Sequence, residues 1–123
     1  MTLQELYAEI GGDYDQAIRV LRVEKLLDKH ICRMASNGVV EQLLDAGKSM
    51  DPAELFERAH AVKGVCANLG LTQIAEHASA IAEEYRPGNS RTMTDGEVRQ
   101  RLDRIGALFT ATVDGIRKYE AEK

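Results

Sequence analysis

The sequence predicts an all-α protein, an antiparallel four-helix bundle with a short additional helix at its N-terminus. Three observations support this fold class. Apolar residues recur at steps of three and four, no segment alternates apolar and polar residues, and short stretches rich in Gly, Pro or Asn separate the periodic segments. The chain has 123 residues, of which 44% are hydrophobic, so residues 1-123 are expected to form a single domain around one core.

The N-terminal part is predicted to hold a short helix and then a long one. A capping box that starts at Thr2 opens the short helix, and Gly11-Gly12 ends it. The long helix begins at Asp13 and continues through apolar positions at helical spacing. Because Asn37-Gly38 interrupts the run, residues 34–47 are expected to continue one kinked helix, with two separate helices as the alternative.

Three further helices complete the predicted bundle. The first begins at Asp51-Pro52, because Asp caps helices well and Pro suits the first helical position, and it ends at Gly70. The second runs from Thr72 to the turn at Pro87-Gly88. The third opens at a second capping box, which starts at Thr94, and its core-facing positions alternate steps of four and three to Tyr119.

Composition excludes several classes of protein. The 20 acidic and 16 basic residues give a formal net charge of -4, whereas a nucleic-acid partner calls for a basic surface. No stretch approaches the roughly 20 apolar residues of a membrane span, and no signal-peptide pattern follows Met1. We therefore expect a cytoplasmic protein without nucleic-acid or membrane partners. The closed bundle with charged outer faces predicts a monomer.

Both cysteines and two of the three histidines are expected to be structural. Cys32 and Cys66 lie among apolar residues without metal-ligand spacing, which predicts small buried thiols. His30 and His77 have no second histidine at a ligand spacing, so they are expected to be partly buried or at the surface. The sequence therefore predicts no metal or cofactor site of its own.

His60 differs from these. At about 100° per residue, it lies roughly 140° from the apolar stripe of its helix, so its side chain is expected to face solvent. Gly64 lies one turn further on, although Gly inside a helix costs about 1 kcal/mol relative to Ala. Small Ala67 and apolar Phe56 flank the same region. A steric reason for this choice of residues is that another molecule must approach the imidazole closely.

Lys63 adds a positive charge one turn from His60. An exposed imidazole, an open approach and a nearby cation favour a histidine that accepts a phosphoryl group and passes it on. The string AHAVKGVCANLG, residues 59–70, resembles the signature of the histidine-containing phosphotransfer (HPt) domain family. That signature has the phosphorylated His, an aliphatic residue two positions on, Lys-Gly next, and small residues before a closing Gly.

The resemblance at the level of residues covers about positions 55–75, and the bundle-like periodicity covers nearly the whole chain. The resemblance implies that His60 is the phospho-acceptor, that Lys63 balances the phosphoryl charge, and that Gly64 leaves room for the partner. Gly70 corresponds to the helix-ending glycine. A docking surface would include Phe56, Gly64 and Ala67.

The function implied by the resemblance is that of a histidine phosphotransfer protein in a multistep two-component phosphorelay. It would carry a phosphoryl group on His60 between aspartates of receiver domains. Its partners would be response-regulator receiver domains, with that of a hybrid histidine kinase among the candidates. Mg²⁺ is expected on the receiver, and the chain is expected to have no cofactor, ATP-binding site or kinase activity of its own.

Two alternatives belong to other classes. A sensor histidine kinase would also carry a phosphorylated His on a helical bundle, but the chain has no Gly-rich nucleotide loop and no room for an ATP-binding domain. A structural or adaptor bundle would bind a receiver or another protein without phosphotransfer.

Overall fold

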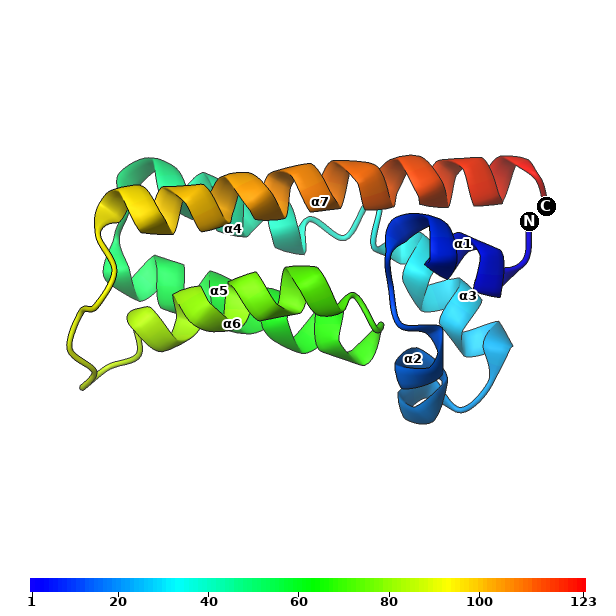
Figure 1. The fold of residues 1–123 in the computed structure, drawn as a ribbon, viewed down its shortest axis with the longest axis horizontal. Helices are drawn as coiled ribbons and strands as arrows, with labels where there is room; N and C mark the ends of the chain where they lie inside the picture. The colour runs from blue at the N-terminus through cyan, green and yellow to red at the C-terminus, as the bar shows by residue number, and fades with distance from the viewer.

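The computed structural model describes all 123 residues and contains seven helices and no strands (Figure 1). The all-α fold class is therefore confirmed. In chain order the helices are α1 (Leu3–Ile10), α2 (Tyr14–Leu21), α3 (Glu24–Arg33), α4 (Val39–Ser49), α5 (Pro52–Asn68), α6 (Thr72–Glu84) and α7 (Asp95–Ala121). None of them combines the length and the apolar character needed to span a membrane.

Helices α4, α5, α6 and α7 form the four-helix bundle. Helix α5 packs between α4 and α6, and α7 packs on both of these neighbours. Each connection reverses the direction of the chain, which gives the antiparallel arrangement seen in Figure 1. One continuous cluster of buried hydrophobic side chains fills the bundle and extends between the N-terminal helices.

The prediction of one long helix from Asp13 is wrong. Three separate helices, α2, α3 and α4, take its place. Of these, α4 is the first helix of the bundle. Two backbone positions cause the breaks. Arg22 has a φ of 75° and Gly38 a φ of 78°, and a right-handed helix cannot continue through either value. Residues 34–47 therefore follow the two-helix alternative.

The N-terminal helices gather at one end of the bundle, and α7 connects the two parts. The long α7 packs against α4 and α6 at its beginning and against α1 and α3 towards its end (Figure 1). Helix α1 lies very close to it, because a Cβ on Gly115 would come within 2.5 Å of Ile10 Cγ2. Tyr119 of α7 also donates a hydrogen bond to Asp28 of α3 at 2.6 Å.

The C-terminal end of α5 is joined directly to the N-terminal part. Gly70, with a φ of 68°, follows α5, and its carbonyl oxygen accepts a hydrogen bond from the N–H of Asp13 at 2.7 Å. A Cβ on Gly70 would lie 2.2 Å from Asp13 O, so only Gly allows this approach. The buried hydroxyl of Tyr7 donates to Leu69 O at 2.7 Å. These contacts fix α1 and the start of α2 relative to the end of α5.

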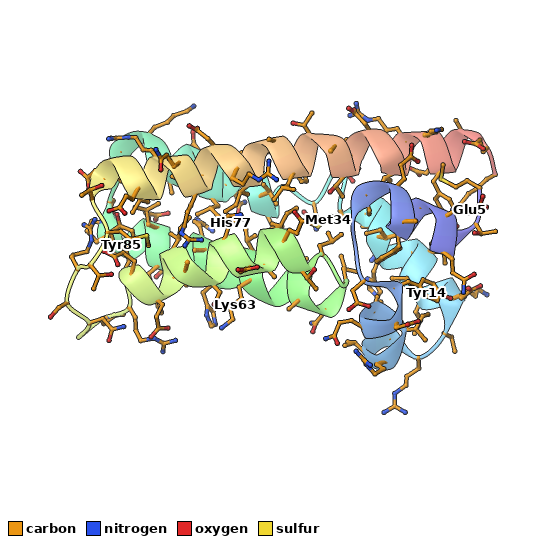
Figure 2. All side chains as sticks on the ribbon, viewed as in Figure 1. Glu5, Tyr14, Met34, Lys63, His77 and Tyr85 are labelled. Carbon is orange, nitrogen blue, oxygen red and sulfur yellow. The ribbon has the colours of Figure 1, made fainter.

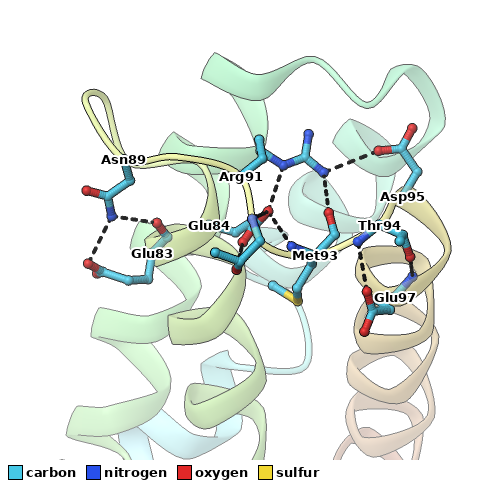
Figure 3. Close-up of polar contacts among 9 residues, drawn as sticks. Glu83, Glu84, Asn89, Arg91, Met93, Thr94, Asp95 and Glu97 are labelled. Carbon is cyan, nitrogen blue, oxygen red and sulfur yellow. Dashed lines mark hydrogen bonds and ion pairs between the residues drawn. The ribbon is translucent and has the colours of Figure 1, made fainter.

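A buried carboxylate organises the loop between α6 and α7 (Figure 3). Glu84, only 5% exposed, accepts hydrogen bonds from the N–H groups of Thr92 and Met93, each at 2.9 Å. Arg91 Nε donates to the same carboxylate at 2.7 Å. Burial by itself raises the pKa of Glu84, but these hydrogen bonds outweigh it and lower the pKa to about 2. The capping box predicted at Thr94 follows directly and is confirmed, as is the one at Thr2.

Candidate functional site

His60 lies in the middle of α5, on the side of the helix that faces solvent. The opposite side is fully buried in the bundle, through Leu55, Ala59, Val62 and Cys66. Because this apolar stripe sets the rotation of the helix, the His60 side chain is exposed, as its place on the helical wheel predicts. The bundle thus presents one imidazole from the centre of a rigid helix, two turns from either end.

Phe56 covers one face of that imidazole. The two rings stack with their centroids 5.9 Å apart and an angle of 25° between the ring planes. Phe56 is itself half-buried, so its ring is held by the bundle while it supports the ring of His60. The only histidine ring that makes a hydrogen bond within the chain is that of His77. Both ring nitrogens of His60 are therefore free to meet another molecule.

Gly64 leaves open space beside His60. A Cβ built at this position would have no atom within 4 Å apart from its own turn of the helix, and the residue is exposed. At Gly47 and Gly115, by contrast, a Cβ would come within 3 Å of a neighbouring side chain. The packing of this chain therefore gives no reason for glycine at position 64, although Gly weakens the helix by about 1 kcal/mol relative to Ala. Ala67 lies about one turn beyond Gly64 and is half-buried, so it adds only a methyl group beside this approach.

Lys63 extends from α5 away from the bundle (Figure 2). Its ammonium group belongs to none of the salt bridges of the molecule, so its charge is available to a bound anion. Its charge contributes to the low pKa of Glu83 on α6. Hydrogen bonds from Arg86 and Asn89 are the larger causes of that low pKa.

The other histidines and the cysteines lie outside this region. His77 is half-buried, and its Nδ1 lies 3.1 Å from Arg101 Nη1; burial lowers its pKa, and the charge of Arg101 adds to the effect. His30 is half-buried as well. Cys66 is a buried thiol, as predicted, and burial raises its pKa to about 12. Cys32 is only half-buried, because it lies at the edge of α3 next to the end of the chain.

One feature near the site was not predicted from the sequence. A groove of about 390 Å³ lies beside the C-terminal half of α5, between that helix and the N-terminal helices. Its lining comes from Leu21 of α2, His30 and Arg33 of α3, and Val65 and Asn68 of α5. The spacing of apolar residues predicts which face of a single helix is buried. It cannot predict a groove that forms between three helices.

A comparison with known proteins identifies the family. The family model described as Hpt domain matches residues 30–108, from the end of α3 to the middle of α7. This range holds the four helices of the bundle up to residue 108, and it contains His60, Lys63 and Gly64. No curated protein and no solved structure matches the chain.

Proposed function

Since the chain belongs to the Hpt domain family, we propose that it is a phosphorelay protein that carries a phosphoryl group on His60 between aspartates of receiver domains. The observation that carries this proposal is the exposed imidazole of His60 in the matched range, next to a helical glycine that the chain's own packing does not need. Docking of a receiver would explain the glycine at position 64, because a larger side chain there would obstruct the receiver's approach to His60.

The proposed step is an exchange of one bond to phosphorus for another. The lone pair of a neutral imidazole nitrogen of His60 attacks the phosphorus of an aspartyl phosphate. A nitrogen–phosphorus bond forms, the bond from phosphorus to the carboxyl oxygen breaks, and the aspartate leaves as a carboxylate. The ring keeps its proton on the other nitrogen until solvent or a partner group removes it. Attack by a second aspartate reverses the step.

The residues around His60 would assist by position and charge. The stacked Phe56 ring restricts the imidazole, and holding the reactants in the correct geometry supplies much of the acceleration of such a transfer. Lys63, which has no carboxylate partner, would balance the negative charge of the phosphoryl group. The receiver would supply its acidic pocket and Mg²⁺, so this chain needs no cofactor of its own. In this proposal it works as a monomer in the cytoplasm.

The proposal is tested with a panel of phosphorylated receiver domains from the same organism. We expect at least one receiver to transfer phosphate to the protein in an acid-labile, alkali-stable form. His60→Gln should abolish this labelling. His77→Gln is the matched control, because glutamine can still hydrogen-bond Arg101 and the site is untouched. The proposal fails if no receiver labels the protein or if His60→Gln is labelled as well as the wild type.

The same experiment separates the alternatives. A structural or adaptor bundle would bind receivers without becoming labelled. A histidine kinase would become labelled with ATP alone, which this proposal does not expect.

A further inference from the structure

The corner between α2 and α3 is the most unusual surface outside the His60 site. The large hydrophobic side chains that are strongly exposed are all there: Val20 (42% exposed), Val23 (50%) and Leu26 (42%). They come from the end of α2, the turn and the start of α3, so all three lie at this corner. Scattered exposed aliphatics need no explanation, but a cluster bordered by charges indicates a contact surface.

The corner and the rest of α3 that follows it are strongly basic in an acidic protein. Residues 18–33 contain five Lys or Arg against two Asp or Glu, a formal charge of +3, while the whole chain carries -4. The rest of the chain therefore carries -7. All five cations are exposed and none belongs to a salt bridge: Arg19, Arg22, Lys25, Lys29 and Arg33.

The two acidic groups of this segment are occupied elsewhere. Glu24 accepts a hydrogen bond from the hydroxyl of Tyr14. Asp28 accepts one from Tyr119 and pairs with Lys123 at 2.7 Å. Arg19 donates a hydrogen bond to the neutral side chain of Gln16 at 2.9 Å, and the other four cations have no internal partner. All five charges therefore remain uncompensated, and they are complementary to a carboxylate-rich surface.

The groove that separates the corner from α5 lies within reach of a protein that docks on His60. The groove between the corner and α5 begins at Val65 and Asn68, which are about 7.5 Å and 12 Å from His60 along the helix axis at 1.5 Å per residue. A standard interface covers roughly 800 Å² per partner, or about 16 Å in radius. Helix α2 and the side chain of Lys63 both project on the side away from α7 (Figures 1 and 2).

The position of the corner relative to His60 is fixed by the contacts already described. The backbone hydrogen bond from Asp13 to Gly70 joins the start of α2 to the end of the helix that carries His60. A rigid surface costs a partner less to bind than a mobile one does. Residues 1–29 also lie outside the range that matches the family model, so the corner can distinguish this chain from other members while the transfer site stays common to them.

We propose that the apolar and basic corner formed by residues 19–26 is the second half of the receiver-docking surface and selects the receivers that exchange phosphate with His60. The selected receiver would present an apolar contact area bordered by Asp and Glu. This inference rests on the proposed function, because it assigns a partner contact to the same transfer reaction.

The test compares transfer rates from several phosphorylated receivers to three variants of the full chain. Val23→Ser combined with Leu26→Ser removes the apolar patch, and Ser at position 23 can cap α3, which has no side-chain cap in the native protein. Arg22→Glu combined with Lys25→Glu reverses the charge. Arg99→Glu combined with Arg104→Glu is the matched control, since both are exposed on α7 and unpaired.

Both corner variants are expected to lose about tenfold in transfer rate at low concentration of the preferred receiver, and to recover the wild-type rate at saturation. Transfer from poor receivers should slow less, so the ratio of the transfer rate from the preferred receiver to that from a poor receiver should fall. Added salt should slow the wild type more than the charge-reversed variant. The control pair should transfer like the wild type. Equal loss in the control, or unchanged rates and ratios in both corner variants, would overturn the inference.

The labelling and transfer results together distinguish failure of the docking inference from failure of the proposed function. If His60→Gln stops labelling but the corner variants transfer normally, the proposed function stands and the docking inference fails. If no receiver labels even the wild type, the proposed function itself fails. Co-sedimentation with vesicles of anionic phospholipid tests the competing occupant. Vesicle binding that is lost in the corner variants while transfer is unchanged would assign the corner to a lipid surface and overturn the inference.

Discussion

The ring of Phe56 stacks on the ring of His60, with centroids 5.9 Å apart and 25° between the planes. The pair spans one turn of α5, and Phe56 is held by the bundle core beneath it. This relationship gives an exposed side chain a preferred orientation without using either of its nitrogens. An unsupported surface histidine would sample several rotamers.

The stack should matter for transfer more than for folding. Phe56→Ala is expected to lower the transfer rate several-fold at saturating receiver, because the imidazole then samples orientations that do not face the incoming phosphoryl group. Phe56→Tyr keeps the ring and should transfer nearly as well as the wild type. The rates come from single-turnover transfer, with thermal melting to show that both variants are folded. A wild-type rate in Phe56→Ala would show that the stack has no role.

Side chains at position 64 should be tolerated by the fold but should slow phosphoryl transfer when they are large. Gly64→Ala is expected to raise the free energy of unfolding by up to about 1 kcal/mol, because a Cβ there meets nothing outside its own turn of the helix and Ala favours the helix. Gly64→Leu should also fold, yet lose tenfold or more in transfer, since its side chain occupies the approach to His60. Ala107→Leu, exposed on α7, is the control for surface leucine. Denaturant unfolding and transfer kinetics measure both effects. Full transfer by Gly64→Leu would contradict the assignment of an open approach.

Gly70 should be essential for stability. Gly70→Ala places a Cβ 2.2 Å from the backbone oxygen of Asp13, at a φ of 68°. The strain at positive φ costs roughly 1–2 kcal/mol, and the displaced backbone adds to it, so a loss of about 3 kcal/mol is expected. Gly38→Ala is the matched control, because it has a similar φ but open space around its Cβ. Denaturant unfolding should show the smaller loss in the control. Equal losses would mean that the close approach to Asp13 contributes nothing.

Glu84 should make the protein sensitive to acid. Its pKa is lowered from the ordinary value of 4.5 to about 2, so its charged form stabilises the fold above pH 4.5. This stabilisation should be lost as the pH falls from about 4.5 towards 2. Glu84→Gln is expected to cost about 2 kcal/mol at pH 7, because the amide loses the negative charge and replaces one of the two acceptor oxygens with an NH2 donor. Its stability should then decline less with acid than that of the wild type. Parallel pH profiles from denaturant unfolding would contradict this role.

The parts of the fold that follow local rules could be predicted from the sequence. Capping boxes at Thr2 and Thr94 are local patterns, and both are present. The exposure of His60 follows from the apolar stripe on its own helix. The break at Arg22 could not be predicted, because Val20, Val23 and Leu27 continue the helical spacing across it and arginine rarely adopts a positive φ.

Other features depend on contacts between distant segments. The hydrogen bonds of Glu84 reach a loop seven to nine residues away, and no periodic pattern records them. The contact of Gly70 with Asp13 joins positions that are 57 residues apart in the chain. The spacing of apolar residues at the corner predicts one long core-facing helix, and only the fold shows that Val20, Val23 and Leu26 remain exposed.

The most direct test of the central claim locates the phosphoryl group on the protein. The wild type is phosphorylated by a receiver and kept at alkaline pH, and the modified residue is identified by fragmentation in a mass spectrometer. Nitrogen-15 NMR of the histidine rings provides an independent assignment. We expect one phosphoryl group, on a ring nitrogen of His60, and none on His30 or His77. A phosphoryl group on any other residue, with His60 unmodified, would contradict this expectation.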